Sequence, residues 1–288
     1  MKAEGSAAAV TPCVIRSLRT LAELRACVLL QEEVWGRGFS EVAPVSLMKA
    51  SQRLGGLVGG AVDESGQVVG FVFGLTGIED GRPVHWSHML AVRRDLRGTG
   101  LGRLLKAWQR DRCLEIDVRR MYWTFDPLVS QNAWLNLGRL GVVVREYVES
   151  MYGVSDSPLH EGLGTDRFVA LWLLDDDRVV NRLEGRGAPP PAWGDVCDLA
   201  RAFPVVQEGG EVRPGKVRPS EWAPGDAVLV PIPADIHGMK ARDSGVAAAW
   251  RATTREALAS RLSRGWEVRD LVRSTEVLSH YVLFPPGT

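Results

Sequence analysis

The segment from His88 to Gln109 concentrates residues that could hold an anion. An apolar strand pattern ends at Val92, arginines follow, and glycines stand at positions 98, 100 and 102 before a helical pattern begins. Alternating glycines let backbone amides point into one concavity, and the start of a helix adds unpaired amides and a positive dipole end. Such a loop is typical of a phosphate-binding site. A glycine-rich turn that only packs tightly is the structural alternative.

Basic residues gather around this loop, although the chain as a whole is neutral. The chain has 35 Lys and Arg residues and 35 Asp and Glu residues, which gives a formal net charge of zero. Basic residues clearly outnumber acidic ones between residues 93 and 120. A local positive field on a neutral protein suits a small polyanion better than a duplex or a membrane surface. We therefore expect neither nucleic acid nor a membrane as the main partner.

The cysteines and the N-terminal residues bear on the compartment. The 4 cysteines are scattered without a C-x-x-C pair, so neither a disulfide framework nor a zinc site is predicted, and no other metal site is expected. The first residues lack the apolar stretch of a signal peptide, and no apolar run approaches the length of a transmembrane helix. Together these features predict a cytoplasmic protein with reduced thiols.

The hydrophobic spacing predicts the elements that must position the loop. Apolar residues at helical spacing predict helices over residues 18–30, 44–52, 101–114, 130–140 and 244–263. Alternating or continuous apolar runs predict strands over residues 56–63, 68–75, 84–92, 121–125, 142–148, 168–174, 227–233, 266–272 and 280–284. Thr20 and Glu23 have the spacing of a capping box at the first helix.

Composition divides the chain into three segments. A Pro- and Gly-rich connecting segment, residues 178–226, separates a first domain over residues 11–177 from a C-terminal subdomain over residues 227–288. The subdomain repeats the order strand, helix, strand, strand that ends the first domain, with Gly265 at the junction where the first domain has Gly141. Because residue identity is low, two ordinary β-α-β-β units remain the alternative to an internal repeat.

Two common phosphate-binding loops do not fit the glycine pattern. A Walker A loop requires Gly-Lys-Ser or Gly-Lys-Thr, whereas Gly102 is followed by Arg103 and Leu104. A dinucleotide fingerprint requires G-x-G-x-x-G and an acidic residue about twenty positions later, whereas the spacing here is G-x-G-x-G. A nucleotide-binding module of another fold is therefore disfavoured.

A third loop does fit. Arg97-x-x-Gly100-x-Gly102 resembles the pyrophosphate loop of the GNAT superfamily of acyl-CoA-dependent N-acetyltransferases. The stretch WTFDPLVSQNAWLNLGRLG also resembles a poorly characterised branch of that superfamily. The resemblance extends over residues 11–174 and implies an α/β (α+β) fold with a GNAT-type mixed, mostly antiparallel sheet flanked by helices. It also makes the C-terminal β-α-β-β unit a candidate for a degenerate half GNAT domain.

The resemblance implies acetyl-CoA, or another acyl-CoA, as the co-substrate. The backbone of the preceding strand would pair with the pantetheine arm through Leu90, Ala91 and Val92. The pyrophosphate would be held by the backbone amides of the loop, namely Arg97, Gly98, Thr99, Gly100, Leu101 and Gly102. On the following motif we expect cofactor contacts from Asn132 and Asn136, with a merely packed amide as the alternative for Asn136.

Amine attack on a thioester needs a base, because only the neutral amine is nucleophilic. His88 stands where many members of the family keep a carboxylate, and a histidine titrates in a suitable range. Asp126 is the second candidate, as a base or as an anion that binds the amine. The structural alternatives are a histidine hydrogen-bonded into the fold and an Asx-turn that Asp126 makes with Pro127.

The proton donor and the acceptor side are less clearly marked. The family usually has a tyrosine that protonates the leaving thiolate, but the matching position here is Leu137. Tyr152 is the predicted catalytic substitute, with a packing role as the alternative. Glu33 and Trp35 are the predicted substrate residues, although Trp35 also suits a core position.

The resulting hypothesis is an acyl-CoA-dependent N-acyltransferase that moves an acetyl group directly to a primary amine of a small molecule or peptide in a ternary complex. The alternative is a GNAT-fold module that binds CoA or regulates a partner without turnover. A homodimer is compatible with the sequence but is not indicated by any particular residue.

Overall fold

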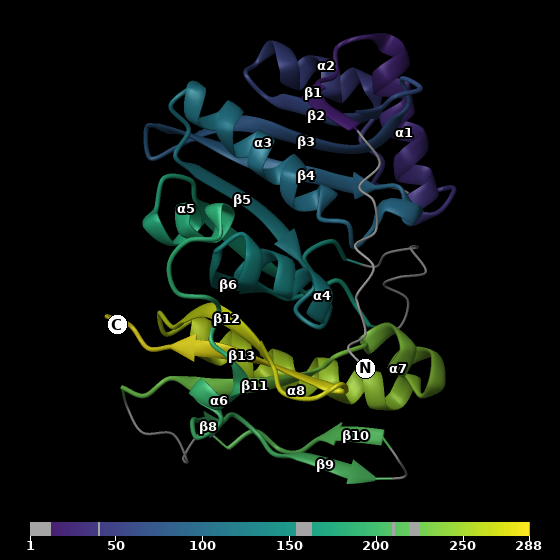
Figure 1. Cartoon of the computed structure of the whole chain (residues 1–288). Helices are drawn as coiled ribbons and strands as arrows, with labels where there is room; N and C mark the ends of the chain where they lie inside the picture. The colour runs from purple at the N-terminus through teal and green to yellow at the C-terminus, as the bar shows by residue number, and fades with distance from the viewer. Residues whose placement is uncertain (1–12, 40, 154–162, 209–210, 219–224, 288) are drawn as a thin grey trace, which may run out of the picture. The chain divides into compact units, whose positions relative to one another are not determined.

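The computed structural model describes residues 13–39, 41–153, 163–208, 211–218 and 225–287 (Figure 1). The chain divides into two compact units, residues 1–121 and 122–288. Within the described ranges, no helix combines the length and apolar composition needed to cross a membrane.

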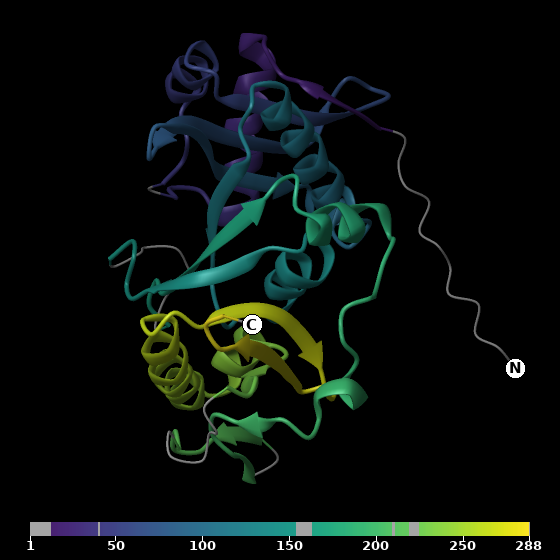
Figure 2. The same ribbon diagram turned by 90° about the vertical axis from the view of Figure 1, so that its left-hand side faces the viewer.

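The first unit is an antiparallel meander with helices on both faces. Its strands follow one another in the sheet in chain order, namely β1 (Cys13–Ser17), β2 (Leu57–Asp63), β3 (Val68–Glu79) and β4 (Arg82–Val92). One face carries α1 (Leu21–Trp35) and α2 (Val45–Arg53), and the other carries α3 (Leu101–Glu115) (Figure 2). A short 3₁₀ helix, η1 (Arg94–Leu96), connects β4 to the glycine loop.

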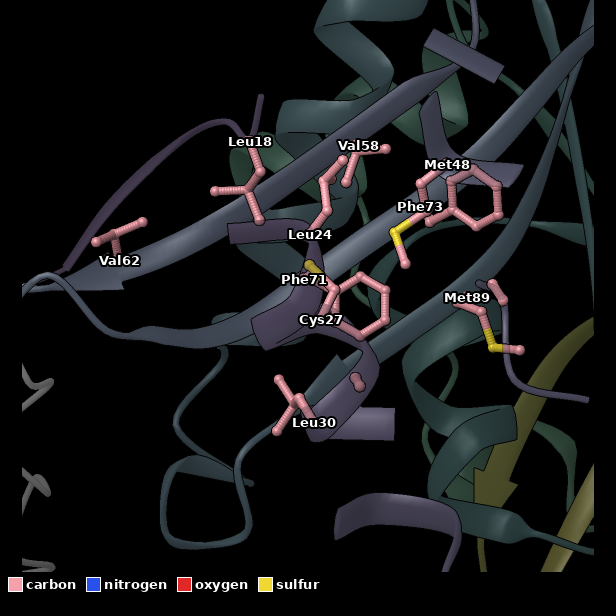
Figure 3. Close-up of a cluster of buried hydrophobic side chains, with 12 residues drawn as sticks. Leu18, Leu24, Cys27, Leu30, Met48, Val58, Val62, Phe71, Phe73 and Met89 are labelled. Carbon is pink, nitrogen blue, oxygen red and sulfur yellow. The ribbon is translucent and has the colours of Figure 1, made fainter. Parts of the chain in front are cut away.

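The core of this unit lies on the side of α1 and α2. Leu24 and Met48 from the helices are fully buried against Phe71 and Phe73 of β3 (Figure 3). Burial of aromatic and aliphatic side chains of this size contributes about 1.5–3 kcal/mol each. On the opposite face a smaller cluster, which includes Leu105 of α3, fixes the helix that follows the glycine loop.

The second unit contains a mixed, mostly antiparallel sheet. Its strand order is β5 (Arg120–Phe125, which crosses the unit boundary), β7 (Arg167–Leu173), β6 (Val143–Val148), β12 (Glu267–Arg273), β13 (Leu278–Phe284), β11 (Val228–Pro233) and β8 (Ala200–Arg201). A separate hairpin pairs β9 (Val205–Glu208) with β10 (Glu211–Pro214). The helices are α4 (Ser130–Ala133), α5 (Asp177–Glu184), α6 (Trp193–Val196), α7 (Ile236–Arg242) and α8 (Ser244–Leu262). The expected fold class, a mixed and mostly antiparallel sheet flanked by helices, is confirmed.

The two halves of this sheet follow the same connectivity in opposite spatial order. The first half runs β5-β7-β6 and the second runs β12-β13-β11, so that the second strand of each half lies at the junction. There β6 pairs antiparallel with β12, with Val144 opposite Val268. Gly141 and Gly265 both adopt positive φ, 72° and 84°, where helix gives way to strand. The predicted echo of strand, helix, strand, strand is thus present in the fold.

Several elements were not predicted from the sequence. The edge strand β1 has only five residues, which is too short for a clear alternating pattern. The segment predicted as a connection contains α5, α6 and β8 to β10. The helix predicted over 130–140 is α-helical only at its start and continues as a π-helix, η2 (Trp134–Arg139). The predicted domain boundaries at 177 and 226 stay a prediction beside the observed division after residue 121.

Candidate functional site

The glycine loop joins η1 to α3 with two residues in the left-handed region. Gly98 has φ 80° and Gly100 has φ 90°, and Gly100 is the N-cap of the 15-residue helix α3. Two side chains hold the loop through hydrogen bonds to the backbone. Thr99 Oγ1 donates to the Leu96 carbonyl at 2.8 Å, and Arg97 Nε donates to the Val92 carbonyl at 3.3 Å. Only glycine adopts this backbone without strain, so the sequence and the conformation agree here.

The backbone amides of the loop have no partner among the described residues, and open space lies beside two of its glycines. In the part of the chain that the structure describes, no hydrogen bond uses the backbone amides of residues 98 to 102. A Cβ built on Gly98 or Gly100 would meet no atom within 4 Å, and the first turn of α3 has no acidic residue. Unpaired amides at the positive end of a long helix are a site for an anion.

His88 is the extra residue of a β-bulge in the strand that leads to this loop. In the register of β3 and β4, Phe73 faces Met89 and Gly74 faces Ser87, which leaves His88 without an opposing residue. A bulge redirects side chains locally and is common beside active sites. The His88 ring meets the edge of Phe73 at 5.8 Å between centroids. The side chain is exposed, so it is accessible to a substrate.

The electrostatic setting of His88 favours the neutral imidazole. Surrounding protein desolvates the ring and lowers the pKa of His88 below its usual value, and the nearby Glu41 carboxylate only partly opposes this. A neutral imidazole at neutral pH can accept a proton, which is what a general base must do.

The opposite face of β4 carries a buried polar chain. Lys106 Nζ donates to Ser87 Oγ at 2.7 Å, Ser87 Oγ donates to Gln109 Oε1 at 2.9 Å, and Gln109 Nε2 lies 3.0 Å from His85 Nε2. His85 Nδ1 lies 3.0 Å from Thr76 Oγ1. Burial, reinforced by the Lys106 charge, lowers the pKa of His85 to about 3. His85 contacts Gln109 of α3, whereas His88 contacts Phe73 of the cluster under α1 and α2, so the two side chains lie on opposite faces of β4.

Asp126 has structural partners on both oxygens. Arg251 Nη2 donates to its two carboxylate oxygens at 2.8 and 2.6 Å, and the Leu128 amide donates to Oδ1 at 2.8 Å. Arg167 Nη1 lies 3.9 Å from Oδ2. With donors on both oxygens, the carboxylate has its hydrogen-bonding capacity engaged by the fold. These contacts favour the Asx-turn that the sequence left open, while a catalytic role for Asp126 stays a prediction.

Tyr152, the predicted proton donor, is accessible. Leu137, which stands at the position of the usual family tyrosine, is not. Tyr152 is 38% exposed, its hydroxyl lies 2.8 Å from Thr124 Oγ1, and the Arg167 guanidinium lies 5.3 Å from its ring centroid. Leu137 is completely buried. Asn136 is also buried, and its Oδ1 accepts from Trp123 Nε1 at 3.2 Å. The packed-amide alternative therefore describes the contact that Asn136 makes.

The remaining predicted site residues lie at the surface or at the core margin. Asn132 is exposed on α4, and Glu33 is exposed in the last turn of α1. Trp35 stacks on Phe39 at 5.6 Å and packs against the cluster under α1 and α2. Their roles in binding stay predictions. Leu90, Ala91 and Val92 pair with β3 along one edge of β4.

Sequence reasoning missed an ion cluster centred on α8. Asp166, whose side chain is fully buried, accepts from Arg255 Nε at 2.8 Å, from Arg255 Nη2 at 2.9 Å and from the Ser150 amide at 3.1 Å. The Tyr147 hydroxyl also donates to Asp166, and burial together with this carboxylate raises the pKa of Tyr147. The only signal was the spacing of four between Arg251 and Arg255, which puts both on one helix face.

Comparisons with known proteins give one family match and several similar solved structures. No curated protein is similar enough in sequence to match the chain. One similar solved structure is yncA, a putative acetyltransferase from Salmonella typhimurium with acetyl-CoA, at 20% identity and a TM-score of 0.45 over 57% of this chain and 95% of that one. Another is the ribosomal-protein-S18-alanine N-acetyltransferase from Escherichia coli, at 17% identity and a TM-score of 0.45 over 57% and 96%. Over residues 25–138, a segment that holds the bulged strand and the glycine loop, the sequence matches the model of the acetyltransferase (GNAT) family.

Proposed function

We propose that this protein transfers an acyl group from acetyl-CoA, or another acyl-CoA, to a primary amine of a small molecule or peptide. The observation that carries the proposal is the loop before α3. Consecutive amides from Gly98 to Gly102 have no partner among the described residues and border open space at the positive end of a helix. This arrangement suits a pyrophosphate, and the match of residues 25–138 to the acetyltransferase (GNAT) family supports the same ligand.

Each residue then has a defined task. The loop amides and Arg97 hold the pyrophosphate, and Leu90 to Val92 offer backbone groups to the pantetheine arm. The bound acyl-CoA supplies the activated acyl group as a thioester. His88 takes the proton that the amine loses, and its accessible, neutral imidazole on a bulge is suited to this step. Tyr152 is the proposed source of the proton for the leaving thiolate.

The first test is binding of acetyl-CoA by isothermal titration. We expect micromolar affinity for the wild-type chain and no binding for Gly100→Glu, because a carboxylate would occupy the anion position. Gly66→Glu is the matched control, since Gly66 also has positive φ, 80°, and open space around it, but lies in the β2–β3 turn. Absence of binding by the folded wild-type protein, or equal binding by both variants, would contradict the proposal.

The second test separates catalysis from binding. CoA-thiol release with a panel of primary amines should fall about 10²- to 10⁴-fold in His88→Ala, the range for loss of a general base. His237→Ala is the control, because His237 is an exposed histidine on α7. Acetyl-CoA binding without CoA-thiol release for any amine would instead support a CoA-binding or regulatory module. The observation in favour of that module is the buried Leu137 at the usual tyrosine position.

A further inference from the structure

A cavity of about 630 Å³ lies in the first unit, where α2 leads into β2. The end of β1, the turn before α1, the second half of α2 and the first residues of β2 line it. Its volume falls in the range of small-molecule pockets, about 300–1,000 Å³. None of its described lining residues belongs to the proposed acyltransferase site.

The strand register separates this cavity from the glycine loop. Val92, the last residue of β4 before the loop, faces Gly70 of β3, and Gly70 faces Ala61 of β2. The cavity is lined instead by Leu57, the first residue of β2. The two features therefore lie at different levels of the sheet and are separate sites.

Three basic side chains line the cavity, and none of the described lining residues is acidic. They are Arg19 in the turn before α1 and Lys49 and Arg53 on α2, and all three are exposed. The dipole of α2 accounts for Arg53, a basic residue in its last turn, but not for Lys49 or Arg19. Three like charges around one cavity repel one another, and a bound anion relieves this repulsion.

The fold does not use these three cationic groups. Among the residues that the structure describes, the side chains of Arg19, Lys49 and Arg53 have no hydrogen bond, ion pair or ring contact. Glu23, an acidic residue close to Arg19 in the sequence, does not line the cavity. Its carboxylate accepts from Arg16 Nη1 at 2.6 Å and from the backbone amide of Arg19 at 2.8 Å. The three cations are therefore available to a ligand.

Hydrogen bonds hold the segments around the cavity together. Gln52 Nε2 of α2 donates to the Leu18 carbonyl at 2.7 Å, and the Leu18 amide donates to the Val58 carbonyl of β2 at 3.0 Å. The Gly56 amide donates to the Ser51 carbonyl at 2.8 Å, which fixes the turn from α2 to β2. The cavity is therefore formed before a ligand arrives, which lowers the entropic cost of binding.

The uncharged part of the wall offers a hydroxyl and aliphatic carbon. Ser17 lines the cavity, and its hydroxyl has no hydrogen bond with another described residue. Leu57 and Val58 supply the aliphatic surface. The described lining residues include no aromatic ring, so the cavity lacks the stacking surface that single-stranded nucleic acid uses. This composition favours a small ligand over a nucleic acid.

We infer that this cavity binds a small polyanion, a compound with at least two phosphate or carboxylate groups, through Arg19, Lys49 and Arg53. Arginine pairs with such groups through two parallel hydrogen bonds, and lysine contributes a point charge. A single phosphate would neutralise only part of the positive charge and fill only part of the volume. Because the site shares no residue with the proposed acyltransferase site, the inference does not depend on the proposed function.

Isothermal titration of the whole chain at low ionic strength tests this inference. The probes are tripolyphosphate, citrate, inorganic phosphate and a short oligothymidylate. We expect tripolyphosphate or citrate to bind with a Kd of about 1 mM or tighter, and about tenfold or more tightly than inorganic phosphate. Arg19→Gln, Lys49→Gln and Arg53→Gln should each weaken that binding about fivefold or more, as expected when one charge-assisted contact is lost.

Two control variants assign the binding to this cavity. Arg25→Gln removes an exposed arginine of α1 that does not line the cavity, and it should bind like the wild type. Gly100→Glu, in the glycine loop, should keep the polyanion binding. The inference is overturned if neither polyanion binds, if inorganic phosphate binds as tightly as both, or if the oligothymidylate binds more tightly than both. It is also overturned if the three cavity variants behave like Arg25→Gln, or if Gly100→Glu abolishes the binding.

Discussion

Asp126→Asn decides between the catalytic and the structural interpretation of Asp126. The carboxylate sits between two buried arginines, with side-chain exposures of 5% for Arg251 and 8% for Arg167. Asparagine keeps an oxygen for the Leu128 amide but removes the charge, so both guanidiniums lose their counter-ion. Breaking a buried ion pair on one side costs about 3–5 kcal/mol. For a unit of this size that corresponds to a fall in Tm of roughly 6–20 °C.

Thermal unfolding followed by circular dichroism measures this effect. The control is Glu149→Gln, which breaks a solvent-exposed pair with Arg255 at 3.6 Å and should change stability by about 1 kcal/mol or less. The double variant Asp126→Asn/Arg251→Gln should cost less than the sum of the two single variants, because the orphaned charge of Arg251 is gone. An Asp126→Asn protein that melts like the wild type but has lost amine acetylation would refute the structural reasoning and restore Asp126 as a base.

Three further predictions concern one helix cap and two buried side chains. Burial lowers the pKa of His85 to about 3, whereas a histidine in the unfolded chain titrates near 6.5. As the pH falls from about 6.5 to about 3, the unfolded chain binds a proton that the folded chain does not, so the free energy of unfolding should decrease over this range. His85→Gln should flatten this part of a pH–stability profile measured by urea unfolding. Thr20→Ala removes a hydrogen bond of 3.2 Å from the Glu23 amide and should cost about 1 kcal/mol in the same assay, whereas Thr20→Ser should cost a few tenths at most. Leu137→Tyr, which introduces the tyrosine usual in the family, should lower stability by about 1–3 kcal/mol without raising turnover, because Leu137 is fully buried; a more active and equally stable variant would contradict its placement in the core.

The loop and its flanking elements could be predicted because their signals are local. The capping box of Thr20 and Glu23 forms as expected, and α3 begins at Leu101 directly after the glycines. Positive φ at Gly98 and Gly100 is a conformation that their residue type permits without strain. The bulge at His88 was not predictable, since it depends on the register between two strands and no residue type in β4 marks it.

The partners of the candidate site residues could not be predicted, because they come from distant parts of the chain. Arg251 reaches Asp126 from 125 residues further along, and Arg255 reaches Asp166 from 89 residues further along. The π-helix η2 was not predictable for another reason, since the apolar spacing of this segment also fits an α-helix.

The junction between β6 and β12 has a consequence for how the chain can be shortened. A protein ending after α5 would leave the backbone groups of β6 around Val144 without their partner strand. Unpaired strand edges invite pairing with another molecule, and such a fragment would self-associate or aggregate even if its core were intact. The C-terminal β-α-β-β unit therefore covers the edge of β6 and prevents that edge from pairing with another molecule.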